Sequence, residues 1–168
     1  SFPFTGKRGH HDGGGNTYTA VYLDDATGRV FTDFLKHKHN YEDNVMRMRA
    51  HMTMCARESI DWNGYDDIQV KTFESDRDSN LTSDKAISDM FANKIKHVMT
   101  ASDSKNQTPL LDGVIRRLQD IARSVMIDAG LKDEWWEFAM RYATMIYNLY
   151  PSKRHRLHHS PMRQWTGR

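Results

Sequence analysis

The chain has 168 residues, of which 38% are hydrophobic and 27% charged, with a mean hydropathy of −0.77 and a net charge of +2. This length suits one domain with a sizeable core, and no run approaches the roughly 18 apolar residues of a membrane helix, so we expect no membrane partner. The single Cys55 excludes an internal disulfide and a multi-cysteine zinc site, and it is compatible with a reducing compartment such as the nucleus or cytoplasm.

The first third of the chain predicts a loop, a hairpin and a helix. Residues 1–16 are rich in glycine and histidine and lack the apolar core of a signal peptide. They do not resemble a natural initiation site, which leaves open that the chain is a fragment of a longer protein. A β-hairpin follows, with arms at Tyr18–Leu23 and Arg29–Leu35 around the turn DDATG. The apolar period then changes, and Asn40–Glu58 is expected to form a helix with arginines on its outer face.

Two strands and a short helix are predicted in the middle of the chain. Ile68–Phe73 predicts a strand that ends in the acidic segment ESDRDSN, and Ile95–Thr100 predicts another. Between them, a helix is expected from about Ser83 to Asn93. Its buried side chains are expected to be Ala86, Ile87, Met90 and Phe91.

Two longer helices are predicted in the last third. The first begins at Thr108-Pro109, an N-cap residue followed by proline at the first helical position, and it ends at Gly130. The second runs from Asp133 to about Leu149 and ends before Pro151. The first helix has an apolar stripe of Leu111, Val114, Ile115, Leu118, Ile121, Ala122, Val125 and Met126. The second is expected to bury Trp136, Ala139, Tyr142, Ala143, Ile146 and Leu149.

The predicted order of elements, β-β-α-β-α-β-α-α, indicates an α/β fold with a mixed sheet flanked by helices. We expect one domain over residues 1–150 and a basic C-terminal extension over residues 151–168. From Lys153 to Arg168 the chain has five basic residues, three histidines and no acidic residue. Such a segment either contacts a phosphate backbone or is simply solvated, and on composition alone we favour the solvated segment.

Carboxylates gather at the ends of two predicted strands. Asp24 and Asp25 close the first hairpin arm, where aspartates usually cap backbone amides. Glu74, Asp76 and Asp78 follow the strand Ile68–Phe73. A carboxylate that leaves the end of a rigid strand can be aimed at a metal ion, so this second group is the better candidate.

Several short patterns, in order along the chain, resemble the integrase catalytic core of copia-type retrotransposons, an RNase H-like fold of the retroviral integrase superfamily. The hairpin GGGNTYTAVYLDDATGRVFTDFLKHK resembles the first hairpin of that core, and VKTFESDRDSN resembles the strand that delivers its second catalytic aspartate. The C-terminal half contributes Thr108-Pro109, Asp112-Gly113-Val114, Ala122-Arg123, Gly130-Leu131, Trp135-Trp136, Ala139, Ala143, Tyr147-Asn148, Pro151, Ser160-Pro161 and Trp165. Together they cover nearly the whole chain.

The resemblance implies DNA integration by metal-dependent strand transfer, with DNA as partner and self-association of the chain. Enzymes of this class use two Mg²⁺ (or Mn²⁺) ions held by three carboxylates, because these hard cations prefer oxygen ligands. Asp76 corresponds to the second catalytic aspartate and is the implied metal ligand. The first aspartate of the family would lie about two residues upstream of Ser1, so the first strand is expected to be truncated. The segment SDRDSN also departs from the family pattern, because Asp78 replaces a glycine.

Arg116 stands where the resemblance requires the last catalytic glutamate. Arginine has no acceptor and a permanent positive charge, so it cannot ligate a cation. Asp112 is an alternative catalytic carboxylate, since 35 residues separate it from Asp76, as is usual in the family. The motif register instead aligns Asp112 with an asparagine, and Asp112, Arg116 and Asp120 have the spacing of an exposed ion-pair ladder.

The sequence leaves three functions open. The first is an integrase-core domain that is catalytically impaired but binds DNA. Its expected DNA-binding residues are Arg116, Arg117, Lys153, Arg154 and Arg156. The second is an interaction module that keeps the scaffold without chemistry. Trp135 and Trp136 lie either at its interface or in the core, and for Trp136 we favour the core. The third is an active metal nuclease that uses Asp76, Asp112 and either Glu74 or Asp78. The histidines are expected in loops and on the surface.

Overall fold

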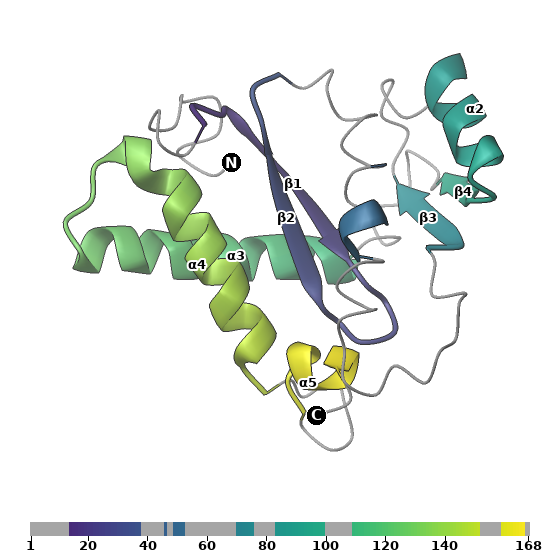
Figure 1. Cartoon of the computed structure of the whole chain (residues 1–168). Coiled ribbons are helices and arrows are strands. Elements are labelled where there is room, and N and C mark those ends of the chain that lie inside the picture. Colours follow the sequence, from purple (N-terminus) through teal and green to yellow (C-terminus); the bar gives the residue numbers. More distant parts are fainter. Residues whose placement is uncertain are drawn as a thin grey trace. The chain divides into compact units, whose positions relative to one another are not determined.

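The structure is a computed structural model that describes residues 14–37, 46, 49–52, 70–75, 83–99, 109–151 and 159–166 (Figure 1). The chain divides into two compact units. The first combines residues 1–38 with residues 110–168, and the second consists of residues 39–109. The expected helix Asn40–Glu58 lies largely outside the described residues, although Met46 and residues 49–52 are helical.

The first unit begins with the expected hairpin. β1 (Tyr18–Leu23) pairs antiparallel with β2 (Val30–Leu35), and Leu23 lies opposite Val30 beside the turn. The Asp24 carboxylate accepts hydrogen bonds from the Thr27 amide at 2.8 Å and from the Thr27 hydroxyl at 2.6 Å. Gly28 has a φ of +72°, a left-handed conformation that strains residues with a Cβ. The sequence prediction that Asp24 caps this turn is therefore confirmed.

Two helices pack against one face of the hairpin. α3 (Pro109–Asp128) and α4 (Trp136–Leu149) cross each other beside β1 and β2 (Figure 1). The core that they form with β2 is made of Val30, Phe34, Val114, Leu118, Ala122, Met126, Trp136, Ala139, Met140 and Ala143. These residues share one face of each element, at a period of two in the strand and three to four in the helices. The apolar stripe predicted for α3 thus lies against the core.

The connection from α3 to α4 is short. The amide of Leu131 donates to the Met126 carbonyl at 2.9 Å, and Gly130 has a φ of +61°. This is the left-handed helix end that glycine favours, as predicted. A 3₁₀ turn, η3 (Asp133–Trp135), leads directly into α4.

The last helix covers the other face of β2. α5 (Pro161–Thr166) begins after Ser160, whose hydroxyl accepts from the Arg163 amide at 3.2 Å. The Trp165 ring meets Phe31 edge-on, with ring centroids 5.3 Å apart. The Arg29 guanidinium lies 4.8 Å from the Phe31 centroid and 5.0 Å from that of Trp165, within the range of a cation–π contact. Part of the predicted basic extension is therefore a packed helix.

The second unit contains a parallel strand pair and one helix. β3 (Thr72–Ser75) pairs with β4 (Lys96–Met99), and α2 (Asp84–Ala92) connects them. The Ser83 hydroxyl accepts from the Ala86 amide at 3.2 Å, the N-cap contact that begins α2. β3 begins four residues later than the predicted strand and continues to Ser75; Val70 and Lys71 are not part of it.

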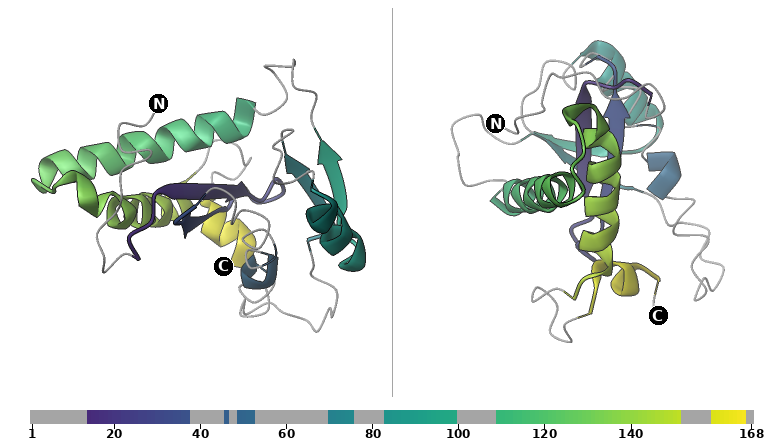
Figure 2. Two further views of the ribbon diagram at one scale, coloured as in Figure 1. Left: turned by 90° about the horizontal axis from the view of Figure 1, so that it is seen from above. Right: turned by 90° about the vertical axis from the view of Figure 1, so that its left-hand side faces the viewer.

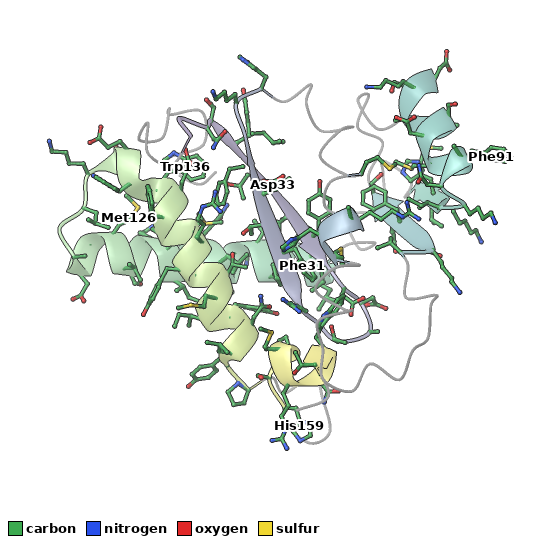
Figure 3. The ribbon with its side chains drawn as sticks, viewed as in Figure 1. Phe31, Asp33, Phe91, Met126, Trp136 and His159 are labelled. Atoms are coloured by element: carbon green, nitrogen blue, oxygen red, sulfur yellow. The ribbon has the colours of Figure 1, made fainter. Side chains whose placement is uncertain are left out.

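Four side chains predicted to be buried are exposed. On α2, Ala86 and Met90 are buried, but Ile87 is 48% exposed and Phe91 85%. Figure 3 shows Phe91 projecting from α2. On α4, Tyr142 and Leu149 are 46% and 54% exposed. The prediction was wrong because each helix uses a narrower core face than its apolar content suggests.

Candidate nucleic-acid and metal site

The strand expected to deliver the second catalytic aspartate ends at Ser75, directly before Asp76. Asp76 and Asp78 lie outside the described residues, and Glu74 is exposed on β3. The sequence assignment of Asp76 as metal ligand and catalytic residue therefore stays a prediction. The structure shows how the end of β3 is attached to β4.

Ser75 is tied to the neighbouring strand by a side-chain hydrogen bond. Its hydroxyl lies 2.8 Å from Nε2 of His97, and the His97 ring also packs on Phe73 at a centroid distance of 5.6 Å. Partial burial lowers the pKa of His97 below the usual 6.5, because desolvation penalises the charged imidazolium. The neutral ring and the serine hydroxyl thus form a cross-strand pair immediately before Asp76.

The first turns of α3 place the other predicted site residues on the surface. Asp112, Arg116 and Arg117 are all exposed. Within the described part of the chain, no ion pair joins Asp112 to Arg116, so the predicted ladder is not formed there. Asp120 instead pairs with Arg123, at 3.1 Å. An exposed ion pair contributes little to stability, because ordering the two side chains costs entropy and their attraction is weak in water.

The donor groups in the described residues do not fit a metal site. No three aspartate, glutamate, histidine or cysteine side chains among them are grouped so that they could hold a cation. On α3, Asp112 is one helical turn from Arg116. Two unit charges of the same sign 4 Å apart repel by about 4 kcal/mol at an effective dielectric constant near 20. A cation on this face of α3 would therefore meet one carboxylate and an opposing arginine.

The basic tail is only partly described. Lys153, Arg154 and Arg156 lie outside the described residues, and Arg163 is exposed on α5. His159 lies 3.1 Å from the Gln164 amide nitrogen, a local contact at the start of α5. This histidine therefore takes part in the helix start.

Three polar residues of α4, Glu137, Thr144 and Asn148, hold the first unit together. Glu137 has no exposed surface, and its carboxylate accepts from the backbone amide of Asn16 at 2.8 Å and from the Asn16 side chain at 3.0 Å. Thr144 lies 3.2 Å from the hydroxyl of Thr32. Asn148 both accepts from the Val30 amide and donates to the Val30 carbonyl, at 2.9 and 2.8 Å. The positions 137, 144 and 148 share one face of α4, a spacing that the sequence shows but that a hydrophobicity pattern does not, because these side chains are polar.

Comparison with known proteins identifies the fold. No protein-family model and no curated protein matches this chain by sequence. One similar solved structure is a simian T-cell lymphotropic virus intasome in complex with the PP2A regulatory subunit B56 gamma, at a TM-score of 0.69 and 12% identity. That match covers 88% of this chain and 47% of the other, so the chain spans about half the length of that relative.

A second similar structure corresponds to the catalytic core alone. It is the integrase catalytic core domain of HTLV-2 in complex with magnesium, in a trimeric form, with a TM-score of 0.62 and 12% identity. The match covers 86% of this chain and 82% of that domain. Among the described residues, no helix has the length and apolar character needed to cross a membrane. The described strands and helices of this chain therefore have the fold of a retroviral integrase catalytic core.

Proposed function

We propose that this chain is an integrase-core domain of a copia-like retrotransposon that binds DNA but is impaired in strand transfer. The observation that carries the proposal is Arg116, exposed on the first turns of α3 within an integrase-core fold. In the resemblance described above, this position belongs to the last catalytic glutamate. The proposal includes DNA as partner and self-association of the chain.

The proposed loss of activity follows from charge. Strand transfer in this class needs divalent cations held by converging carboxylates. The HTLV-2 core was solved with magnesium, but this chain has a guanidinium where a ligand is needed. The resemblance assigns one carboxylate to Asp76, and Asp112 offers another on α3, where the permanent positive charge of Arg116 one helical turn away disfavours a bound cation. We therefore expect Mg²⁺ or Mn²⁺ to bind weakly to this chain.

The proposed DNA binding is supported by the same side chains. Arg116 and Arg117 are both exposed, and neither forms an ion pair with another described residue. Unpaired guanidinium groups on a helix are available for phosphate oxygens, and each contact with a phosphate releases counterions. Lys153, Arg154 and Arg156 extend the set of candidate contacts.

Salt dependence of duplex binding tests the DNA part of the proposal. We expect the wild-type chain to bind duplex DNA with an affinity that falls steeply from low to moderate salt. The double variant Arg116→Ala/Arg117→Ala should lower the slope of log K against log salt by about 2, because each lost phosphate contact contributes about 0.9. Fluorescence anisotropy with a labelled duplex measures both quantities.

A matched control is available on the same helix. Arg123 is already paired with Asp120, so Arg123→Ala should leave the salt slope nearly unchanged. Binding that does not weaken with salt, or an equal effect of all three arginines, contradicts the assignment to Arg116 and Arg117.

Catalysis is tested separately with a strand-transfer and nicking assay in Mg²⁺ or Mn²⁺. The product level of the wild type is expected to equal that of Asp76→Ala, because Arg116 occupies the position of the last catalytic carboxylate. Metal-dependent nicking by the wild type that Asp76→Ala abolishes would falsify the proposed impairment. That result would favour the nuclease that uses Asp76, Asp112 and a third carboxylate.

A second candidate function is a protein-interaction module on the same scaffold. It is favoured by the exposed apolar side chains of α4, which a solvated helix would not need. A chain that binds no nucleic acid at low salt, yet forms a defined complex, would support this function over DNA binding.

A further inference from the structure

The last turn of α2 carries an aromatic side chain that takes no part in the core of the second unit. Phe91 is 85% exposed, although Ala86 and Met90 on the same helix are buried. Its ring projects from α2 (Figure 3). The faces of an exposed aromatic ring remain hydrated, which is unfavourable for so large an apolar group. Phe91 is therefore a candidate contact for a partner.

The helix end next to Phe91 contains a lysine in a conformation that favours glycine. Lys94 has a φ of +56°, and within the part of the chain that the structure describes it is the one residue other than glycine with a positive φ. Its amide donates to the Phe91 carbonyl at 3.0 Å, and the Ile95 amide donates to the Met90 carbonyl at 2.8 Å. These are the two hydrogen bonds of a Schellman helix end, where a Cβ is strained. Lysine thus occupies a position where glycine would make the helix end more stable.

Positive charge gathers beside this helix end. Lys96 is the exposed first residue of β4, and its amide donates to the carbonyl of the exposed Lys71 at 2.8 Å. The Arg49 guanidinium donates to the Asn93 side chain at 2.7 Å. Lys94 is exposed between Asn93 and Lys96, and no acidic residue occurs from position 90 to position 99. Four basic residues therefore belong to the region around the end of α2.

The helix dipole alone does not account for these lysines. The C-terminal end of a helix attracts cations, which favours one positive charge near this point. The Arg49 guanidinium is already there, because it also donates to the Asn93 carbonyl at 3.4 Å. Lys94 and Lys96 add like charges two residues apart, and like charges repel each other unless an anion lies between them. The excess of positive charge therefore predicts an anionic partner.

The two lysine charges are available to such a partner. Within the described residues, neither the Lys94 nor the Lys96 ammonium group forms an ion pair or a hydrogen bond. The acidic residues of α2 are not beside Phe91 either. Asp89 lies about 160° around the helix from Phe91, and Asp84 lies about 10 Å from it along the helix axis. An anion at this end of α2 would therefore meet unpaired positive charge.

The exposed ring distinguishes between kinds of anionic partner. In duplex DNA the faces of the bases are stacked on one another, so Phe91 cannot contact them. An acidic peptide would place its apolar side chains in a groove, whereas a ring that is 85% exposed projects from the surface. In single-stranded nucleic acid the bases are free to stack on an aromatic ring while basic side chains bind the phosphates. Phe91 together with Lys94 and Lys96 therefore fits a single strand.

We propose that Phe91, Lys94 and Lys96, here called the α2–β4 corner, bind single-stranded nucleic acid. One base stacks on the Phe91 ring, and the two ammonium groups contact phosphate oxygens. The strained Lys94 places a charge next to the stacked base, which glycine would not supply. The α2–β4 corner lies in the second unit, whereas Arg116 and Arg117 lie in the first. Binding at this corner is therefore independent of the duplex binding proposed for α3.

Fluorescence anisotropy with the full chain and a labelled oligothymidylate tests the stacking contact. The probe has about twelve nucleotides, within the site sizes of single-strand binding folds. Phe91→Ala should raise the Kd by about 5- to 150-fold, the effect of one lost base–aromatic stack. Phe91→Trp should keep the affinity. Phe91→Leu should lose it as Phe91→Ala does, because leucine is apolar but offers no π face.

Two controls separate stacking from charge and from lost apolar surface. Ile127→Ala removes an apolar side chain that is 74% exposed on α3 and should leave the Kd unchanged. An oligomer of the same length without bases keeps the phosphates, so the wild type and Phe91→Ala should bind it equally. Circular dichroism reports whether each variant is folded.

The lysine contacts are tested by a substitution that separates stability from binding. Lys94→Gly should raise the melting temperature by about 2 to 4 °C, because glycine relieves the left-handed strain. It should also weaken binding, while Lys94→Arg keeps the charge and the affinity. The double variant Lys94→Gly/Lys96→Gln should lower the slope of log K against log salt by about 1.4, because each single-strand phosphate contact contributes about 0.7.

Three results overturn the assignment. The first is a wild-type chain that does not bind oligothymidylate at low salt. The second is a Phe91→Leu variant that binds as tightly as the wild type, which is the behaviour of an apolar contact with a peptide and not of a stack. The third is a Lys94→Gly variant with unchanged affinity. In the Arg116→Ala/Arg117→Ala background the effect of Phe91→Ala should persist, so a failure of duplex binding and a failure of single-strand binding are told apart.

Discussion

Asn148 shows how a single side chain can complete a strand. The backbone amide and carbonyl of Val30 point away from β1, so the hairpin cannot satisfy them. The Asn148 amide presents one donor and one acceptor and bonds both groups, as a neighbouring strand would. Val30 is 1% exposed, so without Asn148 these groups would be buried with reduced hydrogen bonding.

Removal of this amide should destabilise the first unit. We expect Asn148→Ala to lower the free energy of unfolding by about 2 to 4 kcal/mol, because two buried backbone groups lose their partner. Asn148→Asp keeps the acceptor but not the donor, so its free energy of unfolding should lie between those of the wild type and Asn148→Ala. Urea denaturation measures the difference.

The control for this prediction is Ser124→Ala on α3, which removes an exposed hydroxyl bonded to the Asp120 carbonyl at 2.9 Å. Its effect should be below about 0.5 kcal/mol, the usual range for surface positions. Equal losses for Ser124→Ala and Asn148→Ala would contradict a special role for the Asn148 amide.

At the scale of the elements, we expect the stability of the β3–β4 pair to fall in acid because of His97. Burial lowers the His97 pKa in the folded chain, so the unfolded chain binds the proton more readily. The stability that depends on a neutral ring is present above about pH 6.5, the pKa of a free histidine. It is lost as the pH falls below that value towards the lower pKa of the folded state.

We therefore expect the wild type to lose more thermal stability between pH 7.5 and pH 5.5 than His97→Gln. Glutamine can keep a hydrogen bond to Ser75 and does not titrate, and the other eight histidines are common to both chains. Differential scanning calorimetry at the two pH values measures the difference in melting temperature. Identical pH responses of the two chains would refute a role for His97.

The helices illustrate what periodicity can and cannot predict. The apolar stripe of α3 was correctly predicted, although two further apolar residues of this helix, Leu110 and Ile127, are exposed. α4 is apolar on two faces. One is buried, at Trp136, Ala139 and Ala143, and the other is exposed, at Phe138, Tyr142, Met145 and Leu149. The contact of α4 with β2 also uses Thr144 and Asn148, and Glu137 bonds Asn16 just before β1. A hydrophobicity pattern cannot show which of two apolar faces is buried when polar side chains form part of the contact.

At the scale of the whole molecule, the order of elements and the integrase-core fold were predictable, whereas the geometry of the site was not. The hairpin, the start and end of α3 and the glycine stop all have local signals in the sequence. Asp76 is far in sequence from Asp112 and Arg116 of α3, and whether such residues come together depends on long-range packing that local patterns do not specify. The cross-strand pair of Ser75 and His97 was missed for the same reason, because the strand register that aligns the two residues is set by packing.

The discontinuous first unit has a consequence for how the protein is made. Asn148 is 118 residues away from its partner Val30, and chains grow at about 5 to 20 residues per second. The hairpin therefore leaves the ribosome roughly 6 to 24 seconds before the helix that completes it. During this interval α4 does not yet cover Val30 and Phe34. The nascent chain therefore exposes these apolar side chains together with the unpaired backbone edge of β2. Production of folded protein is thus expected to depend on how well the host's chaperones protect that edge until α4 has been synthesised.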